Sequence, residues 1–158
     1  MMHLCCKVLD TLQGKTLVSA ESCTGGMIGE QLTAIPGSSS VYKGGIISYT
    51  NWVKENFLGV DSRLLETHGA VSSPVAKAMA SGARKNLQAD VSVSVTGLAG
   101  PGGDERGNPV GTVFIGVENA DESVVREFHF SGDREAVRCQ AARTALEMIL
   151  ELHKKDAP

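Results

Sequence analysis

The chain has 158 residues, a formal net charge of −3 at pH 7, 42% hydrophobic residues and 21% charged residues. This length and composition predict one soluble globular domain with a sizeable core, and the slight acidic surplus argues against a general nucleic-acid binder. No apolar run approaches the roughly 18 residues of a membrane span, and the four cysteines lack metal or disulfide spacing, so we expect a cytoplasmic protein with reduced thiols.

Hydrophobic periodicity predicts helices and strands that alternate along most of the chain. The predicted helices cover residues 3–12, 26–35, 51–58, a short stretch after Asp61, 74–87 and 133–153. The predicted strands cover residues 16–20, 45–49, 91–95, 111–118 and 123–130. Strands interleaved with helices favour an α/β fold, a three-layer α/β/α sandwich. A hairpin turn around residues 119–121 requires an antiparallel strand, so the five-stranded sheet is predicted to be mixed.

The stretch AESCTGG, residues 20–26, places a small-residue loop between a predicted strand and a predicted helix. Free N–H groups at such a helix start favour an anion, and glycines allow a ligand to approach the backbone. An ordinary hydroxyl cap with a tight glycine turn fits the same residues equally well. Cys23 in this loop is either a nucleophile activated by the helix N-terminus or a small buried residue.

A second stretch, PGSSSVYKGGIISYTNWVK, residues 36–54, combines a serine cluster with Tyr49 at a predicted strand end and Lys54 on the next helix. A serine becomes a nucleophile only when a base removes its proton, and a lysine can be that base when burial keeps it neutral. The alternative to a catalytic pair is an ordinary loop serine together with a solvated surface lysine. Spacing alone leaves both readings open.

The last predicted helix carries Arg134 and Arg138 in line with its apolar face, whereas a solvated pair would lie opposite. Arginines that extend a buried stripe indicate a charged ligand or an internal acidic partner such as Asp133 or Glu21. The long glycine-rich loop after Thr96 and Gly97 is of a length that often serves function. The four histidines have no metal spacing, so we expect neither a metal nor a cofactor.

These motifs together resemble a known family. AESCTGG, PGSSSVYKGGIISYTNWVK, HGAVS, TGLAGPGG, PVGTV and GDREAVR occur in this order in the C-terminal domain of the competence/damage-inducible protein CinA. Stand-alone versions of that domain are the nicotinamide-nucleotide amidohydrolases (PncC). The resemblance runs from about residue 4 to residue 152 and implies a three-layer α/β/α sandwich. Fuller members carry an N-terminal domain that this chain has no room for, so we expect that domain's pyrophosphatase activity to be absent.

The resemblance implies hydrolysis of the carboxamide of nicotinamide mononucleotide by a metal-free Ser/Lys dyad. Carried onto this chain, Ser39 (or its neighbour Ser38) is the expected nucleophile, Lys54 the base and Tyr49 a further active-site residue. The expected substrate-binding residues are Ser22, Thr24, Gly25, Gly26, Thr96, Gly97, Arg134 and Arg138. The resemblance also implies a homo-oligomer, a dimer or larger, with no nucleic-acid or membrane partner. Two alternatives remain: a non-enzymatic or regulatory role, and a cysteine amidase that uses Cys23.

Overall fold

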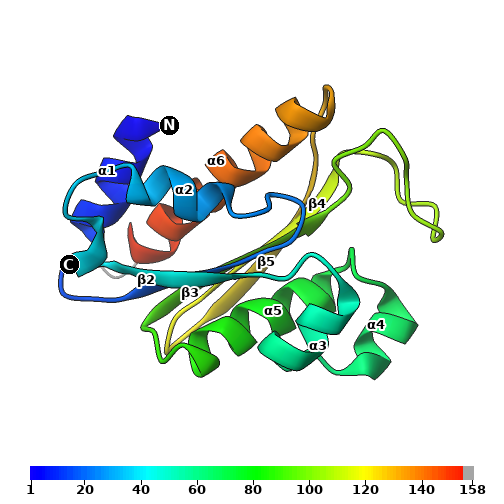
Figure 1. The fold of residues 1–158 in the computed structure, drawn as a ribbon, viewed down its shortest axis with the longest axis horizontal. Coiled ribbons are helices and arrows are strands. Elements are labelled where there is room, and N and C mark those ends of the chain that lie inside the picture. Colours follow the sequence, from blue (N-terminus) through cyan, green and yellow to red (C-terminus); the bar gives the residue numbers. More distant parts are fainter. Residues whose placement is uncertain (155–158) are drawn as a thin grey trace.

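The structure is a computed structural model that describes residues 1–154. Within that range, five strands form one sheet in the order β2-β1-β3-β4-β5 (Figure 1). β1 pairs in parallel with both β2 and β3, whereas β4 is antiparallel to β3 and to β5. The bounds are β1 Leu17–Glu21, β2 Tyr42–Ile47, β3 Val91–Gly97, β4 Thr112–Glu118 and β5 Ser123–His129. The sheet is therefore mixed and five-stranded, as the sequence predicts.

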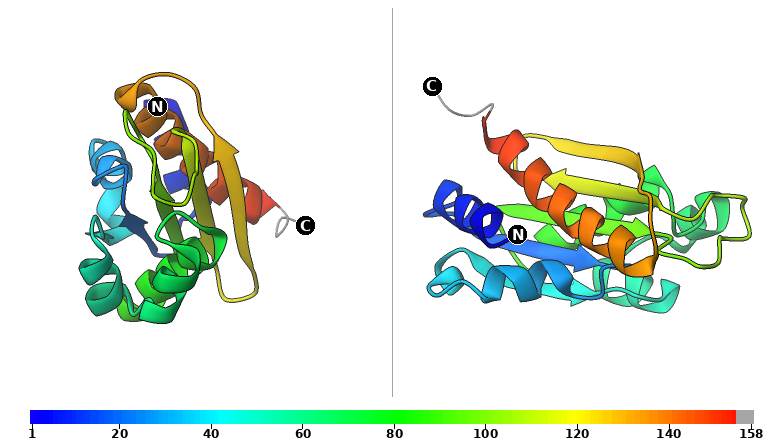
Figure 2. Two further views of the ribbon diagram at one scale, coloured as in Figure 1. Left: turned by 90° about the vertical axis from the view of Figure 1, so that its right-hand side faces the viewer. Right: turned by 90° about the horizontal axis from the view of Figure 1, so that it is seen from above.

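Helices cover both faces of this sheet (Figures 1 and 2). One face carries α1 (Met2–Thr11), α2 (Met27–Thr33) and α6 (Arg134–Lys154), and the other carries α3 (Asn51–Leu58), α4 (Ser62–His68) and α5 (Ser73–Asn86). The two hydrophobic clusters lie on opposite faces of the sheet, with Leu146 and Ile149 in one and Met79 and Ala83 in the other. The predicted three-layer α/β/α sandwich is thus confirmed.

The interior strands are buried on both faces, which explains their small or β-branched residues. Every residue of β1 is buried, and so is every residue of β3 except the last. Serines alternate with valines along β3. The Ser92 and Ser94 hydroxyls face α5 and donate to the carbonyls of Ala80 and Ala76, at 2.7 and 2.6 Å. These bonds satisfy hydroxyls that would otherwise be costly to bury.

Some predicted boundaries shift by a few residues. β2 begins at Tyr42 and ends at Ile47, instead of the predicted 45–49, because its pairing with β1 starts where Leu17 lies opposite Tyr42. α5 begins at Ser73, one residue before the predicted start at residue 74, with Ser72 at its N-cap position. The predicted helix at 51–58 is confirmed at the same residues, with Thr50 accepting a cap hydrogen bond from the Val53 N–H.

The parallel strands β1 and β3 bring their carboxyl ends to the same edge of the sheet. The first turns of α3 and α6 and the loop after β3 meet at this edge, on the right of Figure 1. Open α/β sheets place their ligand sites at such an edge. None of the helices in residues 1–154 combines the length and apolarity needed to cross a bilayer.

Candidate active site

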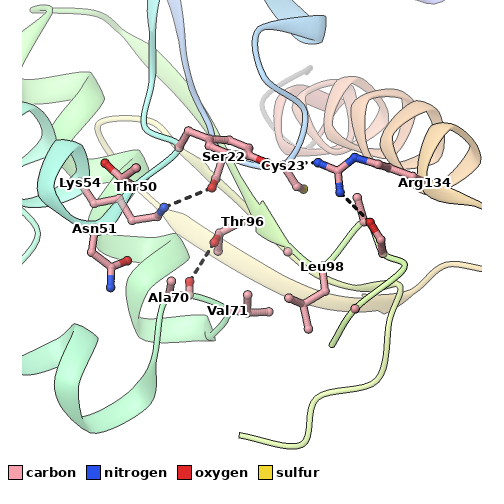
Figure 3. A pocket seen from close by; sticks show the side chains of 15 residues that line it. Ser22, Cys23, Thr50, Asn51, Lys54, Ala70, Val71, Thr96, Leu98 and Arg134 are labelled. Carbon is pink, nitrogen blue, oxygen red and sulfur yellow. Dashed lines mark hydrogen bonds between the residues drawn. The ribbon is translucent and has the colours of Figure 1, made fainter. Parts of the chain in front are cut away.

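A buried lysine contacts a serine hydroxyl at this edge of the sheet (Figure 3). Lys54 lies on α3 and is only 1% exposed. Its Nζ donates to the Ser22 Oγ at 3.1 Å and to the Ser48 carbonyl at 2.7 Å. Ser22 is the first residue after β1, and its own N–H donates to the Val95 carbonyl at 2.9 Å. The strand pairing therefore fixes the serine, and α3 delivers the amine to it.

Burial changes the acid–base character of this lysine. Desolvation lowers the pKa of Lys54 from 10.5 to about 8, although the nearby Cys23 thiol acts in the opposite direction. None of the ion pairs found in residues 1–154 involves Lys54. With that pKa, about a tenth of the amine is neutral at pH 7 and about half at pH 8. A neutral amine beside a hydroxyl is a competent general base.

The Ser22–Lys54 pair lies in the wall of a cavity of about 340 Å³. The wall is built from the ends of β1 and β3, the starts of α3 and α6, and two loops: Ser22, Cys23, Tyr49, Thr50, Asn51, Lys54, Ala70, Val71, Thr96, Gly97, Leu98, Ala99, Gly100, Gly102 and Arg134. It contains one lysine and one arginine and no carboxylate. The charge of the wall therefore favours an anionic ligand.

Arg134 connects two sides of the cavity. Its Nη1 donates to the Gly100 carbonyl at 2.6 Å and its Nη2 to the Tyr49 hydroxyl at 3.1 Å. Thr96 is held differently, because its hydroxyl donates to the Ala70 carbonyl at 2.8 Å. Five of the residues expected to bind substrate or act in catalysis thus share one cavity with Lys54, namely Ser22, Tyr49, Thr96, Gly97 and Arg134.

Ser39 does not share that cavity, so the expected Ser39–Lys54 dyad is not formed. Ser38–Ser40 form a short 3₁₀ helix before β2, whereas Lys54 comes after β2. The six residues of β2 span roughly 20 Å, since a strand rises about 3.3 Å per residue. Ser39 is exposed at the far end of the strand, and Ser38, although buried, is absent from the cavity wall. The hydroxyl that Lys54 contacts belongs to Ser22.

The start of α2 is not a free anion site, contrary to the sequence expectation for Thr24, Gly25 and Gly26. The buried carboxylate of Glu21 accepts the N–H groups of Gly26, Ile28 and Gly29, each at 3.1 Å. Neither Thr24 nor the two glycines line the cavity. From the sequence, Glu21 is expected only as a partner for an arginine. Its place at the end of β1, before the glycine-containing turn that leads into α2, is the available signal for a main-chain partner.

Arg138 also lies outside the cavity wall. Its Nε donates to the Cys23 carbonyl at 3.0 Å and its Nη2 to the Thr24 carbonyl at 3.1 Å. Its Nη1 lies 3.6 Å from a Glu135 carboxylate oxygen. The Arg138 guanidinium is therefore bound by groups of the protein itself. Of the two arginines, only Arg134 lines the cavity.

The thiol of Cys23 lines the cavity but is poorly suited to attack. Burial raises its pKa to about 11, and this outweighs its own main-chain N–H, Arg138 and Lys54, all of which lower it. Since the thiolate is the reactive form, only a very small fraction is available at neutral pH. Within the described residues, no cluster of three or more His, Cys, Asp or Glu side chains could hold a metal ion.

The fold and the site together define an α/β/α domain with a buried serine–lysine pair at the carboxyl edge of its sheet. The family model of the CinA C-terminal domain matches residues 3–153, and the chain belongs to that family. A CinA-like protein of Acidobacterium capsulatum is 48% identical over 138 residues, which are 87% of this chain and 33% of that protein. The chain thus spans about a third of the length of the curated relatives it matches.

Solved structures agree with the fold. A CinA superfamily protein from Klebsiella pneumoniae superposes with a TM-score of 0.95 at 33% identity, covering 98% of each chain. A competence/damage-inducible protein from Agrobacterium tumefaciens superposes with a TM-score of 0.92 at 39% identity, covering 96% of this chain and 94% of that one. The resemblance noted from the sequence motifs is therefore confirmed at the level of the family.

Proposed function

We propose that this domain hydrolyses the carboxamide of nicotinamide mononucleotide to nicotinic acid mononucleotide and ammonia, with Ser22 as nucleophile and Lys54 as base. The observation that carries the proposal is the 3.1 Å contact between the Lys54 amine and the Ser22 hydroxyl in a cavity that also holds Arg134. A lysine that is only 1% exposed and has no carboxylate partner lowers the stability of the fold. A role in catalysis is a reason to keep such a residue.

The reaction proceeds through an acyl-enzyme. Neutral Lys54 takes the proton of Ser22 as its Oγ bonds to the amide carbon, and the carbonyl becomes an oxyanion. Lys54 then gives that proton to the departing amine, the C–N bond breaks and ammonia leaves. Water, deprotonated by Lys54, attacks the ester and releases the acid and the Ser22 hydroxyl.

Main-chain N–H groups beside the nucleophile are the natural oxyanion donors. In residues 1–154, neither the N–H of Cys23 nor that of Thr24 donates to a main-chain carbonyl. Cys23 follows Ser22 directly and lines the cavity, whereas Thr24 does not. We assign the Cys23 N–H to the oxyanion, since the N–H groups of Gly26, Ile28 and Gly29 are engaged by Glu21.

The substrate phosphate is assigned to Arg134. Its guanidinium is exposed at the cavity wall and retains donors beyond its bonds to Gly100 and Tyr49. Arginine forks match phosphate oxygens in geometry and charge. Thr96 and Gly97, at the end of β3, form the wall against which the nicotinamide riboside part lies. Free nicotinamide lacks the phosphate contact and should be a poor substrate.

Ammonia release from nicotinamide mononucleotide, compared with free nicotinamide, tests the proposal. Mass spectrometry should show nicotinic acid mononucleotide in equal amount, and EDTA should leave the rate unchanged because the mechanism uses no metal. Absence of turnover, or turnover that EDTA abolishes and a divalent ion restores, would overturn it. A regulatory, non-enzymatic role predicts nucleotide binding without ammonia. A cysteine amidase predicts loss of activity in Cys23→Ser, which the Ser22 mechanism does not require.

A further inference from the structure

The turn from Ser22 to Gly26 is held by two side chains of opposite charge that are not part of the cavity wall. Glu21, 2% exposed, lies on the β1 side of the turn. One carboxylate oxygen accepts the N–H groups of Gly26 and Ile28, and the other accepts the N–H of Gly29. Main-chain donors at a helix start provide the hydrogen bonds that a buried carboxylate would otherwise lose. This residue therefore fixes the start of α2 to the end of β1.

Glu21 is also connected to the base. Its main-chain carbonyl accepts the N–H of Ser48 at 2.8 Å, and the Ser48 carbonyl in turn accepts the Lys54 amine at 2.7 Å. On its other side, the Glu21 carboxylate accepts the Ser19 hydroxyl at 3.2 Å, and that hydroxyl lies 2.7 Å from the Tyr42 hydroxyl. One residue thus contacts the elements that carry both members of the Ser22–Lys54 pair.

Arg138 holds the same turn from α6. It donates to the carbonyls of Cys23 and Thr24. Glu21 therefore accepts hydrogen bonds from main-chain N–H groups, and Arg138 donates hydrogen bonds to main-chain carbonyls. In a trans peptide the C=O and N–H point in opposite directions. The bond from Arg138 to the Cys23 carbonyl therefore directs the N–H of Thr24 away from Arg138.

We infer that Glu21 and Arg138 form a charged clamp of two positioning residues, which fixes the Ser22–Gly26 turn and thereby the position of the Cys23 N–H beside the oxyanion. This inference rests on the proposed amide hydrolysis. Neither residue touches the substrate. The clamp preorganises the donor, so that no reorganisation is needed when the oxyanion forms. It also gives Arg138 a role different from phosphate binding.

The test uses Glu21→Gln and Arg138→Met, with two matched controls. Glu30→Gln removes an exposed carboxylate from the same helix α2, and Arg143→Met removes an exposed guanidinium from the same helix α6. A glutamine side chain keeps one acceptor oxygen and turns an NH₂ donor toward main-chain N–H groups, so it cannot replace the carboxylate. Losing one oxyanion donor costs about 10²–10³-fold in kcat, and a misaligned hole costs less.

For both clamp variants we expect kcat to fall about 10- to 100-fold with KM for nicotinamide mononucleotide within about twofold. The controls should stay within about twofold of wild type in both constants. The pH at which kcat is half-maximal should not move, because Lys54 keeps its burial. Faster hydrogen exchange at the amides of residues 23–29 should accompany the loss, while circular dichroism remains that of a folded protein.

Three outcomes would overturn the clamp. Exchange at residues 23–29 equal to wild type would show that the turn does not depend on these side chains. Faster exchange with unchanged kcat would make the clamp merely structural. A rise in KM confined to Arg138→Met, absent with the phosphate-free nucleoside, would make Arg138 a phosphate ligand.

A separate readout keeps the clamp distinct from the choice of substrate. A fluorophosphonate probe is attacked at phosphorus by the Ser22 Oγ, fluoride leaves and Lys54 takes the proton. If wild type releases no ammonia from nicotinamide mononucleotide, the proposed function fails. The labelling rate of Ser22 still decides the clamp: a fall of about tenfold in both variants supports it, and an unchanged rate contradicts it.

Discussion

Two turns in this protein have similar composition and different surroundings. The Ser22–Gly26 turn contains one serine and the Pro36–Ser40 turn three, and both combine serine with glycine beside a strand. The first follows β1, an interior strand, and meets α3, α6 and the loop after β3 around a cavity. The second precedes β2, an edge strand, and its Ser40 hydroxyl bonds back to the Gly37 carbonyl. Whether a serine lies beside a base in a cavity therefore depends on its position relative to the sheet and not on local composition.

The sharpest test of this comparison replaces one serine in each turn. Ser22→Ala should lower kcat for nicotinamide mononucleotide by at least about 10³-fold, because removing a nucleophile leaves only binding and oxyanion stabilisation. Ser39→Ala should leave kcat and KM within about twofold of wild type, since Ser39 is exposed at the other end of β2. Steady-state ammonia release measures both. The reverse result would move the nucleophile to the 3₁₀ turn.

Two lysines, Lys43 on β2 and Lys54 on α3, extend the comparison. Lys54→Ala should lower kcat about 10²- to 10⁴-fold, the usual contribution of a general base. Lys54→Arg should fail similarly, because a guanidinium stays protonated. Lys43→Ala is the control, since its amine is exposed and bonds the Gln88 carbonyl at 3.2 Å. The Ser22→Ala, Lys54→Ala double variant should be hardly slower than either single one, as expected for residues that act as a unit. Additive losses would separate their roles.

Arg134 and Arg143 lie on the same helix, α6, but only Arg134 lines the cavity. A charge-assisted contact contributes about 1.5–3 kcal/mol, so Arg134→Ala should raise KM roughly 10- to 100-fold for the mononucleotide. The same substitution should change KM for the phosphate-free nucleoside much less. Arg143→Ala, which removes an exposed pair with Glu147 at 3.1 Å, should change neither. Equal effects on both substrates would assign Arg134 to support of Tyr49 and Gly100.

Among these predictions, a change of pH across the pKa of Lys54 should have the smallest effect on kcat. With a pKa of about 8, its neutral fraction rises about fivefold between pH 7 and pH 8, and kcat should rise by about the same factor before levelling off. The stability effect has a definite sign. The folded state releases the Lys54 proton at lower pH than the unfolded chain, so the unfolding free energy should rise with pH between about 8 and 10.5.

Lys54→Met measures the same burial cost through stability. Below pH 8 both states of the wild type carry the charge, and the folded state bears its desolvation, which is on the order of 3 kcal/mol for a shift of this size. Lys54→Met should therefore raise the denaturation midpoint at pH 7, and its advantage should shrink above pH 8. Lys43→Met should show no such pH-dependent gain. A destabilised Lys54→Met would mean that its two hydrogen bonds outweigh the burial cost.

The sequence by itself determined the layers of this protein and predicted part of its candidate site. The β-branched and small residues of β1 and the alternating valines and serines of β3 predict strands, and amphipathic stretches predict the helices. The resemblance to the family predicted roles for Ser22, Tyr49, Lys54, Thr96 and Arg134, because these residues lie in motifs that occur in the family's order along the chain.

Only the tertiary structure decided which serine meets Lys54 and what Glu21 and Arg138 contact. Ser39 lies closer to Lys54 along the chain than Ser22 does, but a straight strand separates residues at its two ends by its whole length. Parallel pairing of β1 with β2 brings the carboxyl ends of both strands together, so Ser22, 32 positions from Lys54 in sequence, becomes its neighbour in space. Strand order and register depend on long-range packing, and no local pattern around Ser22 or Ser39 encodes them.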